Sequence, residues 1–184
     1  MHNAFLIGER IYLRPLSKED VPQILTYLND GEVARTLNWH RPLTKEAEEQ
    51  WLDKVLVDER QTVLAIALKE NDRFLGGTGL RPGLEKDRRA EFGIYIGAKE
   101  EWNKGYGTEA TRLIVGYGFE TLNLNRIYLH VFACNRGGIR AYEKAGFIKE
   151  GVLRQNAYFE GRYQDTLVMG LLREEWLAQG AEKQ

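Results

Sequence analysis

The spacing of apolar residues changes near the middle of the chain, and this change restricts the folds that the sequence can adopt. Before residue 97, short segments with strand composition cover residues 10–14, 62–68, 74–78 and 89–96. Beyond it, residues 105–122 have helical spacing, residues 127–132 again indicate a strand, and a short helix around 139–145 ends at Gly146. A helix between two strands is the usual crossover connection of a parallel pair. The sequence therefore predicts an antiparallel meander joined to a crossover unit.

Further elements lie near both ends of the chain. One helix is expected from a capping box at Ser17 to Leu28, and another over residues 44–57, with a break at Gly31 between them. Strands are expected at 147–153 and 166–172, with a polar, aromatic turn region between them and a brief helix around Trp176. No Ser-rich or Pro-rich linker divides the 184 residues. We therefore expect one α+β domain over residues 1–184, with a mixed, mainly antiparallel central sheet of about seven strands flanked by helices.

The charge balance and the hydropathy pattern remove several classes of partner. Lys and Arg (26) nearly balance Asp and Glu (27), so the chain lacks the positive field with which proteins attract nucleic acids or anionic lipids. No run approaches the roughly 20 apolar residues that span a bilayer. Residues 1–5 lack a basic segment followed by an apolar one. We expect a cytoplasmic protein that binds neither nucleic acid nor membrane.

Rare residue types exclude several chemistries. Cys134 is the only cysteine, so neither an intrachain disulfide nor a Cys-rich zinc site can form. Ser17 is the only serine and lies at the helix cap, which excludes serine hydrolase chemistry. The histidines His2, His40 and His130 are far apart and form no H-E-x-x-H motif, so we expect no metal site. We interpret Cys134 as a small apolar filler and His130 as a packed ring.

A glycine-containing loop at residues 102–108 joins the strand at 89–96 to the long helix. Gly105 and Gly107 allow positive φ, so backbone N–H groups can converge on one anion at the positive end of the helix. The loop could equally be a plain strand-to-helix turn. Gly105-x-Gly107-x-x-Ala110 also fits the dinucleotide fingerprint, but residues 97–104 separate it from its strand and the acidic ribose ligand is missing.

Three segments together carry a resemblance to a known family. They are Glu91-Phe92-Gly93-Ile94-Tyr95-Ile96, then residues 102–110, then Asn135 with Ile139 and Ala141-Tyr142-Glu143-Lys144-Ala145-Gly146-Phe147. In this order and spacing they resemble the acetyl-CoA-binding motifs of GNAT N-acetyltransferases. The branch is that of the ribosomal-protein N-terminal and spermidine acetyltransferases, and the similarity runs from residues 10–16 to residues 161–165.

The resemblance implies a sheet whose fourth and fifth strands splay apart around the pantetheine arm of acetyl-CoA. It also implies the cofactor-binding residues. Those expected along the pantetheine are Ile94, Tyr95, Ile96, Asn135 and Tyr142, and those expected around the pyrophosphate are Trp102, Asn103, Lys104, Gly105, Tyr106, Gly107 and Thr108. Trp102 departs from the Gln or Arg with which the family's loop often begins.

Two residues are catalytic candidates. Tyr142 is expected near the thioester sulfur as the acid, although its position would also suit an aromatic side chain packed on the sheet. Glu91 is an acid within a strand suited to burial, and a desolvated carboxylate has a raised pKa that suits a general base. Glu91 could instead form a structural ion pair with Arg88 or Arg89.

We therefore expect an enzyme that transfers an acetyl group from acetyl-CoA, without a metal, directly to a primary amine in a ternary complex. The amine could be a small molecule, a polyamine or a protein N-terminus, bound by residues 29–51 and by the turn at 158–165, including Tyr163 and Asp165. Acidic residues there could attract a cation or form a solvated face: Asp30, Glu32, Glu46, Glu48 and Glu49. The alternatives are a non-catalytic acyl-CoA sensor and a dinucleotide-dependent oxidoreductase. An edge strand and exposed aromatics would permit a homodimer.

Overall fold

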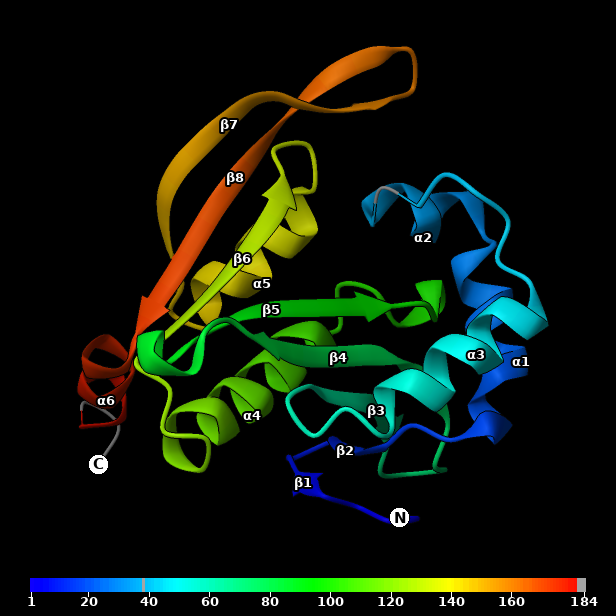
Figure 1. Cartoon of the computed structure of the whole chain (residues 1–184), viewed down its shortest axis with the longest axis horizontal. Coiled ribbons are helices and arrows are strands. Elements are labelled where there is room, and N and C mark those ends of the chain that lie inside the picture. The colour runs from blue at the N-terminus through cyan, green and yellow to red at the C-terminus, as the bar shows by residue number, and fades with distance from the viewer. Residues whose placement is uncertain (38, 182–184) are drawn as a thin grey trace.

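The computed structural model describes residues 1–37 and 39–181, which fold around one eight-stranded sheet (Figure 1). The strands are β1 (Leu6–Ile7), β2 (Ile11–Pro15), β3 (Thr62–Leu68), β4 (Phe74–Pro82), β5 (Arg89–Ile96), β6 (Arg126–Phe132), β7 (Ile148–Phe159) and β8 (Arg162–Leu172). Their order is β1-β2-β3-β4-β5-β6-β8-β7, and only β5 and β6 pair in parallel. The predicted mixed, mainly antiparallel sheet is confirmed. It has one strand more than expected, because residues 6–7 pair with β2.

The helices cover both faces of this sheet. They are α1 (Val21–Leu28), α2 (Gly31–Thr36), α3 (Lys45–Val55), α4 (Tyr106–Glu120), α5 (Arg136–Lys144) and α6 (Arg173–Ala181). A break follows α1 as predicted, at residues 29 and 30, but Gly31 itself is the first residue of α2, because the Asp30 side chain accepts from the N–H groups of Glu32 and Val33. No helix in the described part of the chain is long and apolar enough to cross a membrane.

Strands β5 and β6 separate soon after they meet. Their ladder consists of Arg89 with Arg126, Ala90 with Ile127, and Glu91 with Tyr128, and it stops there. Beyond this point β5 pairs only with β4 as far as Ile96, while β6 pairs only with β8 as far as Phe132. Figure 1 shows the two strands diverging. The predicted splay of the central strands is confirmed.

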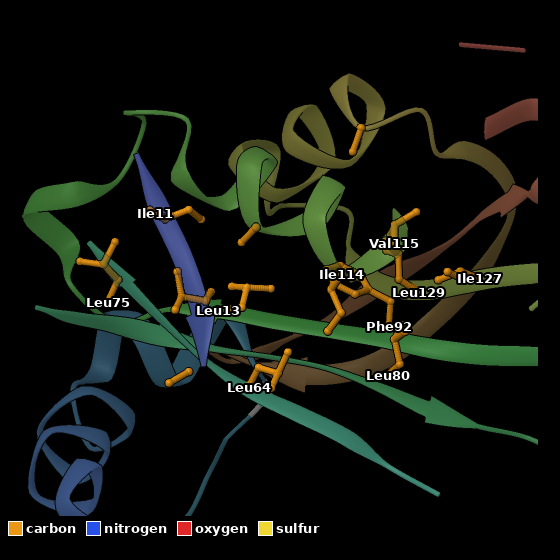
Figure 2. Packing of buried hydrophobic residues seen from close by; sticks show 14 of the residues in the cluster. Ile11, Leu13, Leu64, Leu75, Leu80, Phe92, Ile114, Val115, Ile127 and Leu129 are labelled. Atoms are coloured by element: carbon orange, nitrogen blue, oxygen red, sulfur yellow. The ribbon is translucent and has the colours of Figure 1, made fainter. Parts of the chain in front are cut away.

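The core fixes the position of α4, the helix that follows the glycine-containing loop. Ile114 and Val115 of α4 are fully buried against Leu80 and Phe92 of the sheet, and α1 lies across the opposite face (Figure 2). A Cβ at Gly118 would lie 2.9 Å from the side chains of Leu80 and Ile127. Glycine at this position therefore allows α4 to approach the sheet closely, which holds its N-terminus beside the end of β5.

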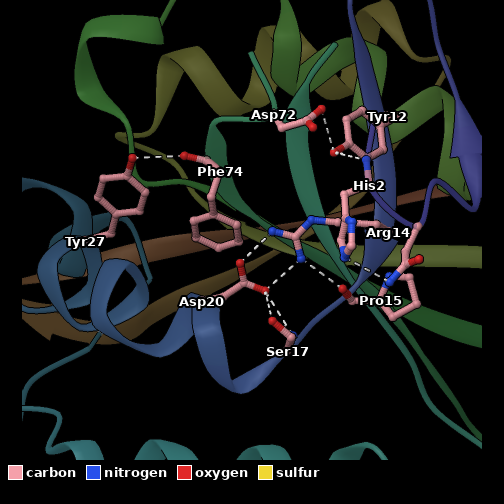
Figure 3. A network of polar contacts seen from close by, with 10 residues as sticks. His2, Tyr12, Arg14, Pro15, Ser17, Asp20, Tyr27, Asp72 and Phe74 are labelled. Atoms are coloured by element: carbon pink, nitrogen blue, oxygen red, sulfur yellow. Dashed lines mark hydrogen bonds and ion pairs between the residues drawn. The ribbon is translucent and has the colours of Figure 1, made fainter. Parts of the chain in front are cut away.

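A buried ion pair ties β2 to the start of α1 (Figure 3). The Arg14 guanidinium donates to both carboxylate oxygens of Asp20, at 2.6 and 2.8 Å, and Asp20 also accepts from the Ser17 N–H at 2.9 Å. The hydrogen bond to Asp20 raises the pKa of Arg14. The capping box predicted at Ser17 is thus present, and both carboxylate oxygens of Asp20 accept hydrogen bonds from described residues.

The last two strands form a longer hairpin than predicted. Residues 158–165 were expected to be a turn region, but β7 continues to Phe159 and β8 begins at Arg162. Glu160 and Gly161 alone make the turn, with φ of 53° and 75°. Two successive residues with positive φ are typical of the tight hairpin turn whose twist matches the strands. Aromatic residues therefore continue the strands up to the turn.

Glu48 of α3 provides a test of this packing. Glu48 is only 5% exposed. Its carboxylate forms no hydrogen bond or ion pair with another described residue, and burial raises the pKa of this carboxyl group. An acid with a raised pKa in the folded state lowers stability above its unfolded pKa and costs nothing where both states are protonated. We predict that Glu48→Gln raises the melting temperature by roughly 1–3 °C at pH 8 and leaves it unchanged near pH 4.

The matched control is Glu46→Gln on the exposed side of the same helix, which should change the melting temperature less at both pH values. A lower melting temperature of Glu48→Gln at pH 8 would show that the Glu48 carboxylate stabilises the fold.

Candidate active site

Two cavities meet where β5 leaves β6. The first, of about 350 Å³, extends from β5 along the N-termini of α4 and α5. The second, of about 310 Å³, lies between the diverging parts of β5 and β6 and reaches β8. Both are lined by Thr36, Ile94, Asn135 and Tyr142. The two cavities therefore adjoin at these four residues.

The open edge of β5 forms one wall of the first cavity. Ile94, Tyr95 and Ile96 all line it, and β4 pairs with β5 on the opposite edge only. Backbone amides of a strand alternate between its two edges, so part of this segment lacks a strand partner. An extended ligand with amide groups could complete the ladder here, as predicted for the pantetheine arm.

The loop before α4 provides a cluster of free donors. Asn103 and Gly105 have φ of 62° and 91°, and the backbone N–H groups of residues 103–108 donate no hydrogen bond to any described residue. These groups converge at the N-terminus of a 15-residue helix, whose dipole adds partial positive charge. The arrangement suits an anion such as a pyrophosphate, which supports the anion-site interpretation over a plain turn.

All the predicted cofactor residues line the first cavity except Lys104. The Lys104 ammonium turns away to Glu101, 2.9 Å from its carboxylate, and the Lys104 carbonyl accepts from Arg10 at 2.8 Å. Only the backbone N–H of Lys104 remains for a ligand. Lys104 could therefore take part in the expected pyrophosphate contacts only through its backbone N–H.

Arg10 braces the loop from outside, a role that the sequence did not predict. Its Nε donates to Glu109 at 3.0 Å, its Nη1 donates to the Lys104 carbonyl, and its guanidinium lies 4.7 Å from the centre of the Tyr106 ring. Glu109 also accepts from the backbone N–H of Ile11 at 3.2 Å. These contacts hold β2 against the N-terminus of α4. Ile11 and Glu109 are 98 residues apart in the sequence, so no local pattern indicates the contact.

Trp102 fastens the beginning of the loop to the end of β5. The indole Nε1 donates to the Ile96 carbonyl oxygen at 2.7 Å. This bond explains how tryptophan can stand where the resembled family often has Gln or Arg, because tryptophan still offers a side-chain N–H donor. It ties the end of β5 to the beginning of the loop before α4.

Tyr142 projects from α5 to the junction of the two cavities. Its ring meets Phe92 and Phe147 edge-on, with centroids 6.0 and 6.2 Å away. Burial raises the pKa of Tyr142 to about 12, and its hydroxyl makes no hydrogen bond with the described residues. Asn135 caps the same helix by accepting from the Gly138 N–H at 2.9 Å. The phenol is thus oriented by packing and keeps its proton at neutral pH.

Glu91 lies at the fork, the point where β5 and β6 separate, but its pKa is shifted in the opposite direction from the one expected. Burial pushes its pKa upward, yet hydrogen bonds from Arg81 and His130 outweigh burial, so the pKa of Glu91 is lowered. The ion-pair partner is Arg81 of β4 and not Arg88 or Arg89, because strand pairing places residue 81 opposite residue 91. The raised pKa expected from burial alone is wrong.

His130 is not the packed ring that the sequence indicated. Its side chain is 40% exposed, its Nδ1 lies 3.1 Å from Glu91 Oε1, and it lines the second cavity. Cys134 is also exposed and is no apolar filler. His130 follows the point where β5 has departed, and Cys134 lies in the turn after β6 ends at Phe132.

The predicted acceptor segments contribute to the second cavity only in part. Thr36 and Leu37 line it, whereas Asp30 and Glu32 pair with Lys99 at 2.7 and 2.6 Å. Asn38 of the same segment lies outside the described residues. Neither Tyr163 nor Asp165 lines either cavity: Tyr163 packs against Tyr158, and Asp165 accepts from the Gln155 N–H.

Two further residues of the cavity wall have no signal in the sequence. Asn156 and Thr166 line the second cavity and bond to each other at 3.2 Å. They meet across the hairpin beside a register shift between Leu153 and Ala157 of β7. A bulge of this kind changes the direction of nearby side chains. It has no clear sequence signal and is found only from the pairing register of β7 with β8.

Comparisons with known proteins agree with this geometry. A family model described as an acetyltransferase (GNAT) domain matches residues 10–148. The chain is 31% identical over 175 residues to the uncharacterized N-acetyltransferase p20 of Bacillus licheniformis, covering 93% of this chain and 97% of that protein. It is 32% identical over 170 residues to the spermidine N(1)-acetyltransferase of Escherichia coli K12, covering 92% and 89%.

A solved structure is similar over the same length. The spermidine N-acetyltransferase of Vibrio cholerae in complex with CoA and spermine superimposes with a TM-score of 0.83 at 28% identity, covering 91% of this chain and 98% of the other.

The bond between Trp102 and Ile96 supplies a test of the first cavity. Trp102→Phe keeps an aromatic ring and removes only the N–H donor, so the loop loses about 0.5–1.5 kcal/mol of support. We predict that CoA affinity, measured by calorimetry, falls by about 2- to 10-fold. Trp51→Phe, at a partly exposed site outside both cavities, is the control and should bind CoA like the wild type. Equal affinity of both variants would contradict a role for this bond.

Proposed function

The chain belongs to the GNAT acetyltransferase family, and we propose that it transfers an acetyl group from acetyl-CoA to a primary amine by direct attack in a ternary complex. The observation that carries the proposal is the meeting of the two cavities at Tyr142. One cavity has the donors and the open strand edge that a nucleotide thioester needs. The other is separate from it and open to an acceptor. Direct transfer requires such a junction, because the nitrogen must approach the thioester carbon while both substrates are bound.

The cofactor is proposed to lie along the first cavity. Its pyrophosphate would accept hydrogen bonds from the N–H groups of residues 103–108, and its pantetheine would lie beside Ile94–Ile96. Asn135 can donate from its amide nitrogen, since its oxygen is already used in capping α5. The thioester would then lie next to Tyr142. CoA in the similar Vibrio cholerae structure supports this use of the fold.

In the proposed step the lone pair of the neutral amine forms an N–C bond to the thioester carbonyl carbon. The C–S bond breaks, its electron pair goes to sulfur, and Tyr142 donates a proton to the departing sulfur. The nitrogen loses a proton toward the Glu91 side of the second cavity, and solvent restores the proton of Tyr142. These side chains meet the proton demands of acyl transfer, so the proposed mechanism includes no metal ion.

The acceptor is proposed to be an amine with a compact end. Glu91 is the one carboxylate among the residues that line the second cavity, and the other polar side chains there are neutral or histidine. Apolar wall residues, including Leu37, Phe92 and Val131, would surround the carbon atoms next to the amine. Relatives named spermidine N(1)-acetyltransferases support a polyamine, and a protein N-terminus offers the same primary amine.

A screen of amines tests the proposed function. Purified protein and acetyl-CoA are incubated with spermidine, aliphatic and aromatic monoamines, and peptides with free N-termini, and products are identified by mass spectrometry. Gain of one acetyl group with matching release of free thiol is expected for at least one class. Tight CoA binding with no thiol release for any amine would favour the acyl-CoA sensor instead.

Tyr142→Phe tests the acid. The variant keeps the ring that packs against Phe92 and Phe147 but lacks the hydroxyl, so CoA affinity should remain unchanged. Thiol release with an active amine should fall by roughly 100-fold, the scale of lost general-acid help. Turnover equal to the wild type would remove Tyr142 from the mechanism.

We also propose that two copies associate along β7. This strand is last in the sheet order, and Ile148, Val152 and Leu153 on it are 41–54% exposed. Sedimentation analysis should give the mass of a dimer, and Val152→Lys should shift it toward the monomer because burying a lysine at an edge is costly. Leu84→Lys, at an exposed loop site away from β7, is the control. A monomeric wild type would contradict the proposal.

A further inference from the structure

We propose that His130, oriented by Glu91, is the group that accepts the proton lost by the acceptor amine. The inference rests on the proposed amine acetyl transfer and deepens it by assigning the base. The sequence by itself favours Glu91 as the base and His130 as a packed ring. The contacts at the point where β5 and β6 separate instead favour His130 as the base and Glu91 as the residue that orients it.

The position of His130 follows from the parting of the strands. Tyr128 is the last residue of β6 that pairs with β5, and His130 is the next residue on the same face. With β5 gone, its ring is open to the second cavity, which it lines together with Tyr142. Tyr128 supports the ring edge-on, with centroids 5.9 Å apart. The imidazole is therefore both accessible and held in place.

The hydrogen bond to Glu91 decides which nitrogen of His130 can accept a proton. An ionised carboxylate can only accept hydrogen bonds, so the Nδ1 atom, 3.1 Å from Glu91 Oε1, is the protonated one. The lone pair of the neutral ring then resides on Nε2. Nε2 has no hydrogen-bond partner among the described residues. This is the arrangement in which a carboxylate orients an imidazole for base catalysis.

Glu91 itself is poorly suited to take the proton. Its Oε1 is engaged by His130 and its Oε2 by Arg81, which reaches across from β4. Arg81 keeps the carboxylate ionised, and an ionised Glu91 stabilises the imidazolium that forms when His130 is protonated. In the described part of the chain, the charged and titratable groups near His130 are Glu91 on β5, Arg81 on β4, Tyr128 on its own strand and Tyr142 of α5, while Asn156 and Thr166 of the hairpin are neutral.

The proton balance of the step is then complete. As the N–C bond forms, the nitrogen gives one proton to His130 Nε2. The C–S bond breaks toward sulfur, which takes a proton from Tyr142. His130 afterwards releases its proton to solvent and Tyr142 regains one from it, so the enzyme returns to its starting state. Base and acid come from β6 and α5, on different walls of the same cavity.

His130→Asn separates a base from a structural contact. The asparagine amide can still donate to Glu91 in place of Nδ1, but it cannot accept a proton. We expect kcat with an active amine to fall about 100-fold, with CoA affinity and melting temperature unchanged. His2→Asn, at the exposed N-terminus far from both cavities, is the matched control and should retain wild-type turnover.

A rescue experiment provides a readout that a structural role would not move. Added imidazole should restore part of the turnover of His130→Ala, more strongly as pH rises from 6 to 8 and more imidazole is neutral. His130→Asn within twofold of the wild type, or His130→Ala folded and slow but not rescued, would overturn the assignment of His130. If Tyr142→Phe is then still impaired, the proposed function stands. A wild type that acetylates no amine would overturn the proposed function and this inference together.

Discussion

The separation of β5 from β6 after Glu91 and Tyr128 is the constraint on which the rest of the site depends. A backbone edge left unpaired inside a sheet costs stability unless another partner satisfies it, so such a gap suits a ligand with amide groups of its own. The same separation opens the second cavity and exposes His130 to it. Binding of the cofactor, access of the acceptor and placement of the proposed base therefore share one structural cause.

The environments of Tyr142 and Glu91 shift the pKa values of these two groups in opposite directions. Burial without a partner raises the pKa of Tyr142 to about 12, whereas Arg81 and His130 overcome burial and lower the pKa of Glu91. Tyr142 thereby keeps its proton at neutral pH, and Glu91 is ionised there. Opposed environments of this kind are how a single cavity can support both acid and base chemistry at neutral pH.

Long-range contacts hold the loop before α4 in register with this fork. Arg10 and Glu109 connect β2 to α4, and Trp102 connects the loop to the end of β5. The close approach of α4 at Gly118 sets the depth of the helix on the sheet. The positions of the N–H groups of residues 103–108 thus depend on contacts with the sheet and not on the loop alone. Binding sites generally need such support from rigid neighbouring elements.

Local patterns in the sequence determined the elements and their type. The predicted strand at residues 89–96 matches β5, and the cap at Ser17 and the helix after Gly105 follow from apolar spacing, capping residues and glycine. These signals are local because burial of one face and the geometry of one turn involve neighbouring residues. The tertiary structure alone decided that Glu91 pairs with Arg81 and His130, that Arg10 braces the loop, and that Asn156 and Thr166 reach the cavity. Charges and cavity walls depend on which strands lie side by side and in what register, and no short stretch of sequence carries that information.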